Sequence, residues 1–215
     1  MQNPKTKTSN SHKAMPEKTS RTLRHSKHRV LGFATMNRHK FEEASLILRE
    51  FNIRLKQLRL KPPEIQSEEP AEIAENCARA LVGEVEEPFI VEDAGLFIDG
   101  LHGFPGPYSA YVNRTIGLTG ILHLMSGMQN RGASFVSALA FVDEKHDVKV
   151  FVATVRGEIT ARILGEHGFG FDPIFKPHGA SKTFAEMSTV EKCVWSHRAR
   201  ALRKFASWFL KTELH

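Results

Sequence analysis

Cysteine is scarce in this sequence, and the common zinc-binding patterns are missing from it. Two of the 215 residues are cysteines, Cys77 and Cys193, and their spacing fits neither a disulfide framework nor a zinc site. The eleven histidines contain no His-Glu-x-x-His pattern. No apolar run approaches the roughly 20 residues that a membrane-spanning helix requires. We therefore expect a cytoplasmic protein with reduced thiols and no membrane partner.

Negative charge is nearly absent from the first 28 residues. This segment holds seven of the 30 Lys and Arg residues but one of the 24 acids, Glu17, so it carries the whole formal charge of +6. Residues 29–215 contain 23 charges of each sign. Because the segment also has few apolar residues, we predict a basic disordered tail over 1–28. Two explanations of it stay open: an arm with weak, salt-sensitive affinity for nucleic acid, or a translation start that truly lies at Met15.

The remaining 187 residues alternate between strand-like and helix-like patterns and are enough for one domain. Strands are expected at 29–34, 53–58, 88–91, 96–98 and 133–142, then at 148–155 with further strand-like alternation over 158–164. Helices are expected from about 39, from 70, over 116–125 and after a capping box at 188–191. The two long apolar runs, 133–142 and 148–155, predict a hairpin buried on both faces. This order predicts an α/β fold with a mixed sheet.

The most informative stretch is 91–112, where a strand-like apolar run meets two adjacent carboxylates, Glu92 and Asp93. We expect the strand to end at these acids, and a loop rich in Gly and Pro to follow at 103–109. Carboxylates at the end of a buried strand suit the binding of a hard divalent cation with a water beside it. The alternative is a strand end whose acids cap a turn.

A second patch, Thr35 to Lys40, stands at a predicted helix N-terminus. Backbone N–H groups at such a terminus, with the hydroxyl of Thr35, the amide of Asn37 and the amine of Lys40, form a cradle for anions. The alternative is an ordinary helix cap followed by a solvated lysine. Glu64 lies in an irregular segment interrupted by proline, where a solvated surface acid is the competing interpretation.

A third patch, residues 167–173, has the sequence HGFGFDP. Its glycines allow the backbone to approach a ligand closely, and Phe169 or Phe171 can stack on a flat ring. The alternative is a tight turn with two core phenylalanines. The patch is therefore a candidate for binding a planar heterocycle.

The fourth patch joins Lys192 with His197 and Arg198. On one continuous helix Lys192 and His197 would lie about 140° apart, so they share a ligand only if the helix breaks. Ser196 could cap a new helix with His197 and Arg198 in its first turn. A solvated basic helix face is the alternative.

Taken in order, these patches resemble one family, the inosine/xanthosine triphosphate pyrophosphatases, and an archaeal-type member in particular. The resemblance covers residues 29 to about 211. Five matches carry it: Thr35-x-Asn37-x-x-Lys40, Val91-Glu92-Asp93-x-Gly95-Leu96, the loop 103–109 (GFPGPYS), the segment 168–175 (GFGFDPIF), and the segment 182–198 with Lys192 and Ser196-His197-Arg198. Each match is modest alone, but five in family order are specific.

The resemblance implies an ITPase-like fold over 29–215: a long mixed sheet flanked by helices, in two lobes with the active-site cleft between them. It implies Mg²⁺-dependent hydrolysis of ITP, dITP and XTP to the monophosphate and pyrophosphate, cleansing the nucleotide pool, by a homodimer. Two alternatives remain. One is a related pyrophosphatase acting on pyrimidine or modified nucleotides, and the other is a nucleotide- or nucleic-acid-binding protein without turnover.

The resemblance also implies a role for each site residue. Asp93 would be the catalytic proton acceptor with Glu92 beside it, and Glu64 and Asp93 would hold the magnesium ion. The implied substrate-binding residues are Thr35, Asn37, Lys40, Ala94, Phe169, Gly170, Phe171, Asp172, Lys192, His197 and Arg198. Because arginine has only donors, Arg198 fits a 6-oxo group and not the 6-amino group of adenine. GTP carries the same 6-oxo group, so another contact must reject it.

Three positions depart from the family pattern, all on the expected phosphate side. Met36 stands where glycine is usual, and its side chain could crowd the phosphates. Cys77 stands where a lysine is common, and Ala110 where many members carry a basic residue. These departures weaken the phosphate-side assignment and leave the expected metal and base sites unchanged.

Overall fold

The computed structural model describes Met1 and residues 29–212, so the tail predicted over 1–28 lies outside the described residues except for Met1. Within 29–212, seven strands form one sheet in the order β2-β1-β3-β5-β6-β7, with β4 paired to β3. β1 runs parallel to β2 and β3, and the other pairs are antiparallel. The predicted mixed sheet is confirmed. The strands are β1 Arg29–Ala34, β2 Ile53–Leu58, β3 Phe89–Ile98, β4 Pro105–Gly106, β5 Gly132–Val142, β6 Val148–Ile159 and β7 Phe175–Pro177.

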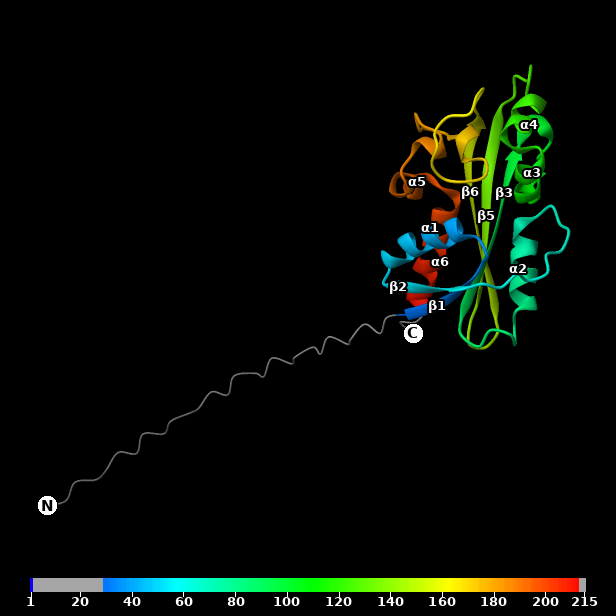
Figure 1. Ribbon diagram of the computed structural model, residues 1–215. Coiled ribbons are helices and arrows are strands. Elements are labelled where there is room, and N and C mark those ends of the chain that lie inside the picture. Colours follow the sequence, from blue (N-terminus) through cyan, green and yellow to red (C-terminus); the bar gives the residue numbers. More distant parts are fainter. Residues whose placement is uncertain (2–28, 213–215) are drawn as a thin grey trace.

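Helices cover both faces of this sheet. Figure 1 shows α1, α5 and α6 on one face and α2, α3 and α4 on the other. The described α-helices are α1 Arg38–Arg49, α2 Pro70–Ala80, α3 Ser109–Thr115, α4 Gly117–Leu124, α5 Thr189–Trp195 and α6 His197–Thr212. Short 3-10 turns lie at Asp99–Leu101, Asp172–Ile174 and Phe184–Glu186. In the described part of the chain, none of the helices has the length and apolar character needed to cross a bilayer.

The helix ends follow from local chemistry that the sequence displays. Asn37 is the N-cap of α1, and its Oδ1 accepts a hydrogen bond from the Lys40 backbone N–H at 3.2 Å. α2 begins at Pro70, whose missing N–H costs nothing in the first helical turn. The predicted capping box is present, because Ser188 and Glu191 each bind the other's backbone N–H at the start of α5.

The expected end of the strand at Glu92 and Asp93 is wrong. β3 continues through both acids to Ile98, and they pair with Leu139 and Ala138 of β5 in an unbroken antiparallel register. Successive side chains of a strand point to opposite faces, so the two carboxylates diverge from the middle of β3. Acids are stable there because Glu92 has cationic partners on its face and Asp93 opens into a cleft.

The predicted hairpin of two long strands is confirmed, but one of its strands is not buried on both faces. β5 is buried along almost its whole length, whereas β6 alternates between buried and exposed positions. The difference follows from position, since β5 lies between β3 and β6 while β6 is flanked by the three-residue β7. The strand-like alternation expected to continue to 164 ends at Ile159, and α3 was not expected.

Candidate active site

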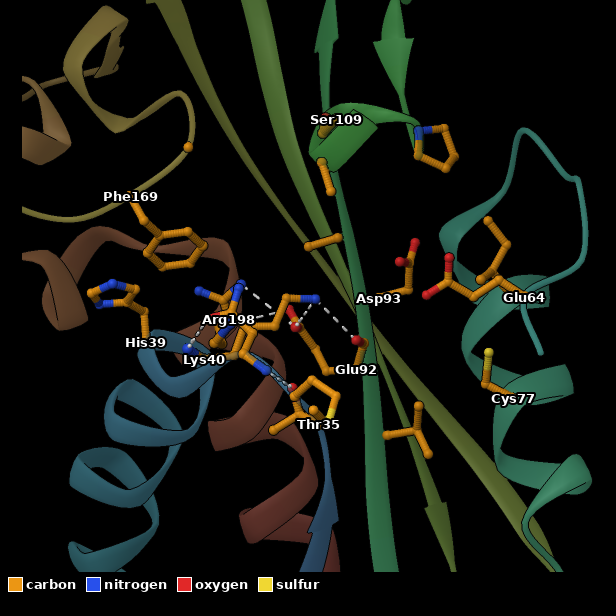
Figure 2. A pocket seen from close by; sticks show the side chains of 18 of the residues that line it. Thr35, His39, Lys40, Glu64, Cys77, Glu92, Asp93, Ser109, Phe169 and Arg198 are labelled. Atoms are coloured by element: carbon orange, nitrogen blue, oxygen red, sulfur yellow. Dashed lines mark hydrogen bonds and ion pairs between the residues drawn. The ribbon is translucent and has the colours of Figure 1, made fainter. Parts of the chain in front are cut away.

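All fourteen side chains or backbone positions that received a site role line one cleft of about 480 Å³. β3 crosses the cleft, with Glu92 on the side of α1 and α6 and Asp93 on the side of α2 (Figure 2). The cleft therefore has two ends. One end is formed by Asp93 and the segment before α2, and the other by α1, the 168–172 loop and the start of α6.

The first end brings two carboxylates together. Figure 2 shows the carboxylates of Glu64 and Asp93 pointing toward one another. Asp93 Oδ2 is buried and has no hydrogen-bond partner among residues 29–212. Burial raises the pKa of Asp93 to about 6 against the opposing effect of Lys40, and the charges of Glu92 and Glu64 add to the rise.

An orphaned buried carboxylate beside a second carboxylate fits a divalent cation. Within the described residues no group of three or more His, Cys, Asp or Glu side chains could enclose a metal ion. Mg²⁺ commonly binds through one or two carboxylates and completes its shell with substrate phosphate oxygens and water. The donor set formed by Glu64 and Asp93 therefore suits Mg²⁺ bound together with a phosphorylated ligand.

Glu92 faces the opposite way and is saturated with partners. Its side chain is 1% exposed, and Lys40 Nζ lies 2.9 Å from Oε2. Ser137 Oγ donates to Oε1 at 2.7 Å, and Arg198 Nε lies 3.2 Å from the same oxygen without hydrogen-bond geometry. Burial alone would raise the pKa of Glu92, but the charges of Arg198 and Lys40 outweigh it and hold this pKa far below its usual range. Such a carboxylate is a permanent anion that orients its two cations.

A further acid, Glu43 on α1, was missed from the sequence. It organises the end of the cleft that α1, the 168–172 loop and the start of α6 form. Its carboxylate accepts hydrogen bonds from Lys192 Nζ at 2.7 Å and from Arg198 Nη1 at 2.5 Å, with all three side chains nearly buried. Burial opposes ionisation, yet Arg198 and Lys192 lower the pKa of Glu43. One feature of the sequence could have indicated its role. Glu43 shares the buried face of α1 with Ala44, Ile47 and Leu48, where an acid without a cationic partner would not be stable.

The loop that carries Phe169 is held by Asp172. Asp172 Oδ2 accepts the Phe169 backbone N–H at 2.9 Å and the Lys192 amine at 2.6 Å. Burial raises the pKa of Asp172 despite the lysine. Gly168 is required beside it, because φ is 74° and a Cβ there would collide with the Asp172 carboxylate. The Phe169 ring lies under two cations, with Lys192 Nζ 4.7 Å and Arg198 Cζ 5.4 Å from its centroid.

The helix break on which the fourth patch depended is present. α5 ends at Trp195, Ser196 has extended backbone angles, and α6 begins at His197. Ser196 Oγ accepts the Ala199 backbone N–H at 3.2 Å, so the break brings His197 and Arg198 to the cleft beside Lys192.

The His197 ring is held inside the protein and is uncharged. It stacks on Phe135 with centroids 4.5 Å apart and planes 7° apart. Burial and then the charge of Arg198 hold the pKa of His197 well below 6.5. Its Nδ1 is buried and finds no partner in the part of the chain that the structure describes. A neutral imidazole with an unused nitrogen can accept or donate one hydrogen bond to a ligand.

The expected phosphate side is built by the turn before α1. Thr35 Oγ1 accepts the Asn37 backbone N–H at 3.1 Å, and Lys40 Nζ donates to the Glu92 carbonyl at 3.1 Å. Each of the three departing residues, Met36, Cys77 and Ala110, also lines the cleft.

Cys77 is not an activated nucleophile. Its Sγ donates to the Pro63 carbonyl at 3.5 Å, and burial raises the pKa of Cys77 to about 11, with Glu64 and Asp93 contributing. At neutral pH the thiol therefore keeps its proton.

Fold and cleft together define an α/β protein in which one cleft joins a carboxylate pair to a cation-lined aromatic pocket. The Ham1 family model matches residues 31–208. Among curated proteins, the dITP/XTP pyrophosphatases of Methanopyrus kandleri and Saccharolobus solfataricus are 47% and 48% identical, over 82% and 83% of this chain and 94% and 92% of theirs. The solved structure of the Staphylococcus aureus Ham1 protein matches with a TM-score of 0.74 at 29% identity, over 86% of this chain and 100% of that chain.

The chain belongs to the Ham1 family. The family that the motifs resembled, and the fold it implied, are thereby confirmed.

Proposed function

We propose that this protein hydrolyses non-standard purine nucleoside triphosphates, ITP, dITP and XTP, to the monophosphate and pyrophosphate. The observation that carries the proposal is one cleft with the buried, unpaired Oδ2 of Asp93 at one end and the Arg198–Phe169 pocket at the other. The names of the curated relatives support the same substrate class. A triphosphate with its base in the pocket would extend across β3 toward the carboxylates of Asp93 and Glu64.

The base end would select a 6-oxo purine. The guanidinium of Arg198 has five N–H donors, and its contacts with Glu43 and Glu92 use only part of them. Because those two carboxylates fix the guanidinium before the ligand arrives, the remaining donors are already oriented. An adenine 6-amino group would leave a donor unpaired at a cost of about 1–3 kcal/mol, or about one to two decades of discrimination. Phe169 would stack on the base, and His197 would offer a hydrogen bond.

The carboxylate end would carry the reaction. Glu64 and Asp93 would hold Mg²⁺, which when bound neutralises charge on the phosphates and activates water. Asp93, with an unpaired Oδ2, is suited to accept a proton from water that attacks the α-phosphorus. Lys40 and the N-terminus of α1 would bind the phosphates. Glu92 would act as a positioning residue for Lys40 and Arg198, because it has no free oxygen and a strongly lowered pKa.

Two further expectations belong to the same proposal. We infer that the enzyme works as a homodimer in the cytoplasm, as the family resemblance implies. Cys77 and Cys193 are both buried and not paired in a disulfide, which agrees with a reducing compartment.

Turnover of ITP with Mg²⁺ in ¹⁸O-labelled water tests the site of attack. We expect the label in inosine monophosphate and unlabelled pyrophosphate, because water attacks the α-phosphorus. Label in pyrophosphate or in free phosphate would rule out this reaction.

Asp93→Asn should lose at least about 99% of kcat while urea unfolding stays cooperative, whereas retained turnover would remove Asp93 from the mechanism.

A further inference from the structure

A ring at an unspecified position of the Thr35-x-Asn37-x-x-Lys40 motif lies against the base pocket. His39, in the first turn of α1, stacks on Phe169 with ring centroids 5.2 Å apart and planes 13° apart. The two residues come from different segments of the chain, and both line the cleft. Figure 2 shows His39 and Phe169 side by side at the end of the cleft near Arg198 and Lys40, across β3 from Asp93 and Glu64.

The stack is not part of the hydrophobic core. His39 is exposed and Phe169 is half-buried, so neither ring is fixed by close packing on all sides. By contrast, the groups around them are tightly held, since Lys192 and Arg198 are tied to Glu43 and the loop backbone is tied to Asp172. The His39 ring is thus an exposed, movable group that faces the half-buried Phe169 ring, whose backbone is tied to Asp172.

We propose that His39 is the second face of an aromatic clamp, and that the purine binds between the His39 and Phe169 rings. This inference rests on the proposed function and names the residue that adds to base affinity. Flat rings stack at about 3.5 Å, so a base between the two would place them roughly 7 Å apart. Because the two rings already stack on one another, a base between them requires their planes to separate by one further stacking distance, about 3.5 Å, which an exposed side chain can reach by a rotamer change.

The clamp makes a specific kinetic prediction. A stacking contact is present in both the bound substrate and the transition state, so its loss raises KM and leaves kcat unchanged. The contact depends on a flat ring and not on the imidazole nitrogens. Phenylalanine at position 39 should therefore replace histidine, and alanine should not.

Calorimetric binding of inosine monophosphate and of magnesium pyrophosphate, measured on the full chain, tests the proposal. His39→Ala should weaken inosine monophosphate about ten-fold and raise KM for ITP by a similar factor, with kcat within two-fold. His39→Phe should restore both values to within about three-fold of the original. Pyrophosphate has no base, so its affinity should be the same in all variants.

The pyrophosphate measurement distinguishes loss of the clamp from damage to the neighbouring turn at Asn37 and Lys40, which would weaken pyrophosphate binding as well. Arg38→Ala is the matched control, since Arg38 is in the same turn of α1 but is exposed and paired with Glu42. Equal weakening of both ligands, or unchanged inosine monophosphate affinity in His39→Ala, would overturn the clamp. Tighter binding by His39→Ala would also overturn it, because His39 would then compete with the base.

The two proposals fail in different ways. If the unmodified protein binds inosine monophosphate but does not hydrolyse ITP, the proposed function fails and the clamp is decided by the binding data alone. If ITP is hydrolysed and His39→Ala binds inosine monophosphate normally, the clamp fails and the proposed function stands. Failure of the unmodified protein to bind inosine monophosphate overturns the clamp.

Discussion

A buried cluster of charged side chains lies at the end of the cleft near Phe169 and consists of Glu43, Lys192 and Arg198. Glu43 holds both Lys192 and Arg198, and each cation has a second carboxylate, Asp172 for the lysine and Glu92 for the arginine. These charged groups are almost fully buried, so they are stabilised by one another and not by water. The arrangement fixes the donors of Arg198 at the cleft wall, although Glu43 belongs to none of the five motifs.

Glu43→Gln should therefore be strongly destabilising. It removes the shared partner of two buried cations, and we expect the free energy of unfolding to fall by about 3–5 kcal/mol in urea titrations. Glu42→Gln is the control, because Glu42 is exposed and pairs with Arg38 one turn along the helix, where a pair contributes about 0.3–0.5 kcal/mol. Equal effects of the two substitutions would show that the buried network does not hold this part of the protein together.

His197 should make stability depend on pH. Burial keeps the folded-state pKa of His197 well below the 6.5 of an unfolded histidine, so below pH 6.5 the unfolded chain binds a proton that the folded chain does not. The contribution of this residue is present above pH 6.5 and declines below it by up to about 1.4 kcal/mol per pH unit.

His197→Phe keeps the stack on Phe135 and removes this titration. The free energy of unfolding of the original protein minus that of the variant should fall as urea titrations are repeated from pH 8 to pH 5. A difference that stays constant across this range would mean that His197 binds protons equally in the folded and unfolded states, so that folding does not lower its pKa.

At the scale of elements, the cleft depends on one interruption between two helices. A continuous α5–α6 helix would turn Lys192 away from His197, whereas the extended Ser196 lets α6 start anew with His197 and Arg198 in its first turn. The sequence left this open, because a Ser-His-Arg run continues a helix as readily as it caps one. The carboxylates that Arg198 meets after the break come from α1 and β3, far from it in sequence.

Ser196→Ala tests that interruption. Loss of the bond from the Ala199 N–H to Ser196 Oγ should lower the free energy of unfolding by about 1 kcal/mol, as for other N-caps. Ser196→Gly also removes the hydroxyl and, because Ser196 and Ala199 are buried, leaves the same N–H without a partner, so it should cost at least as much. No loss of stability in either variant would contradict a capping role.

The strand β3 shows where prediction from sequence reached its limit. The bounds of β1 and β2, the start of α2 and the capping box of α5 were predictable, because caps, proline and alternation act over a few residues. The continuation of β3 through Glu92 and Asp93 was not, because it depends on pairing with β5 and on cations about 50 and 100 residues away in the chain. Glu43 and His39 escaped notice for the same reason: their partners are distant in sequence.

For the whole molecule, the net positive charge and the cleft lie in different parts of the chain. Every residue that lines the cleft lies between Ala34 and Arg198, and residues 29–215 carry equal numbers of positive and negative charges. Removal of residues 2–28 should therefore leave kcat/KM for ITP within a few-fold at moderate salt. A loss of more than ten-fold in steady-state assays would show that the basic segment takes part in substrate capture.

The account as a whole claims that one cleft combines α-phosphate hydrolysis with selection of a 6-oxo purine that is not guanine. Phosphate release coupled through an inorganic pyrophosphatase, measured with ITP, XTP, GTP, ATP and UTP, tests both parts at once. We expect kcat/KM for ITP and XTP to exceed that for ATP by at least ten-fold, and GTP and UTP to be poor substrates. A preference for UTP, equal rates with ATP, or no turnover of any of the five would contradict the account.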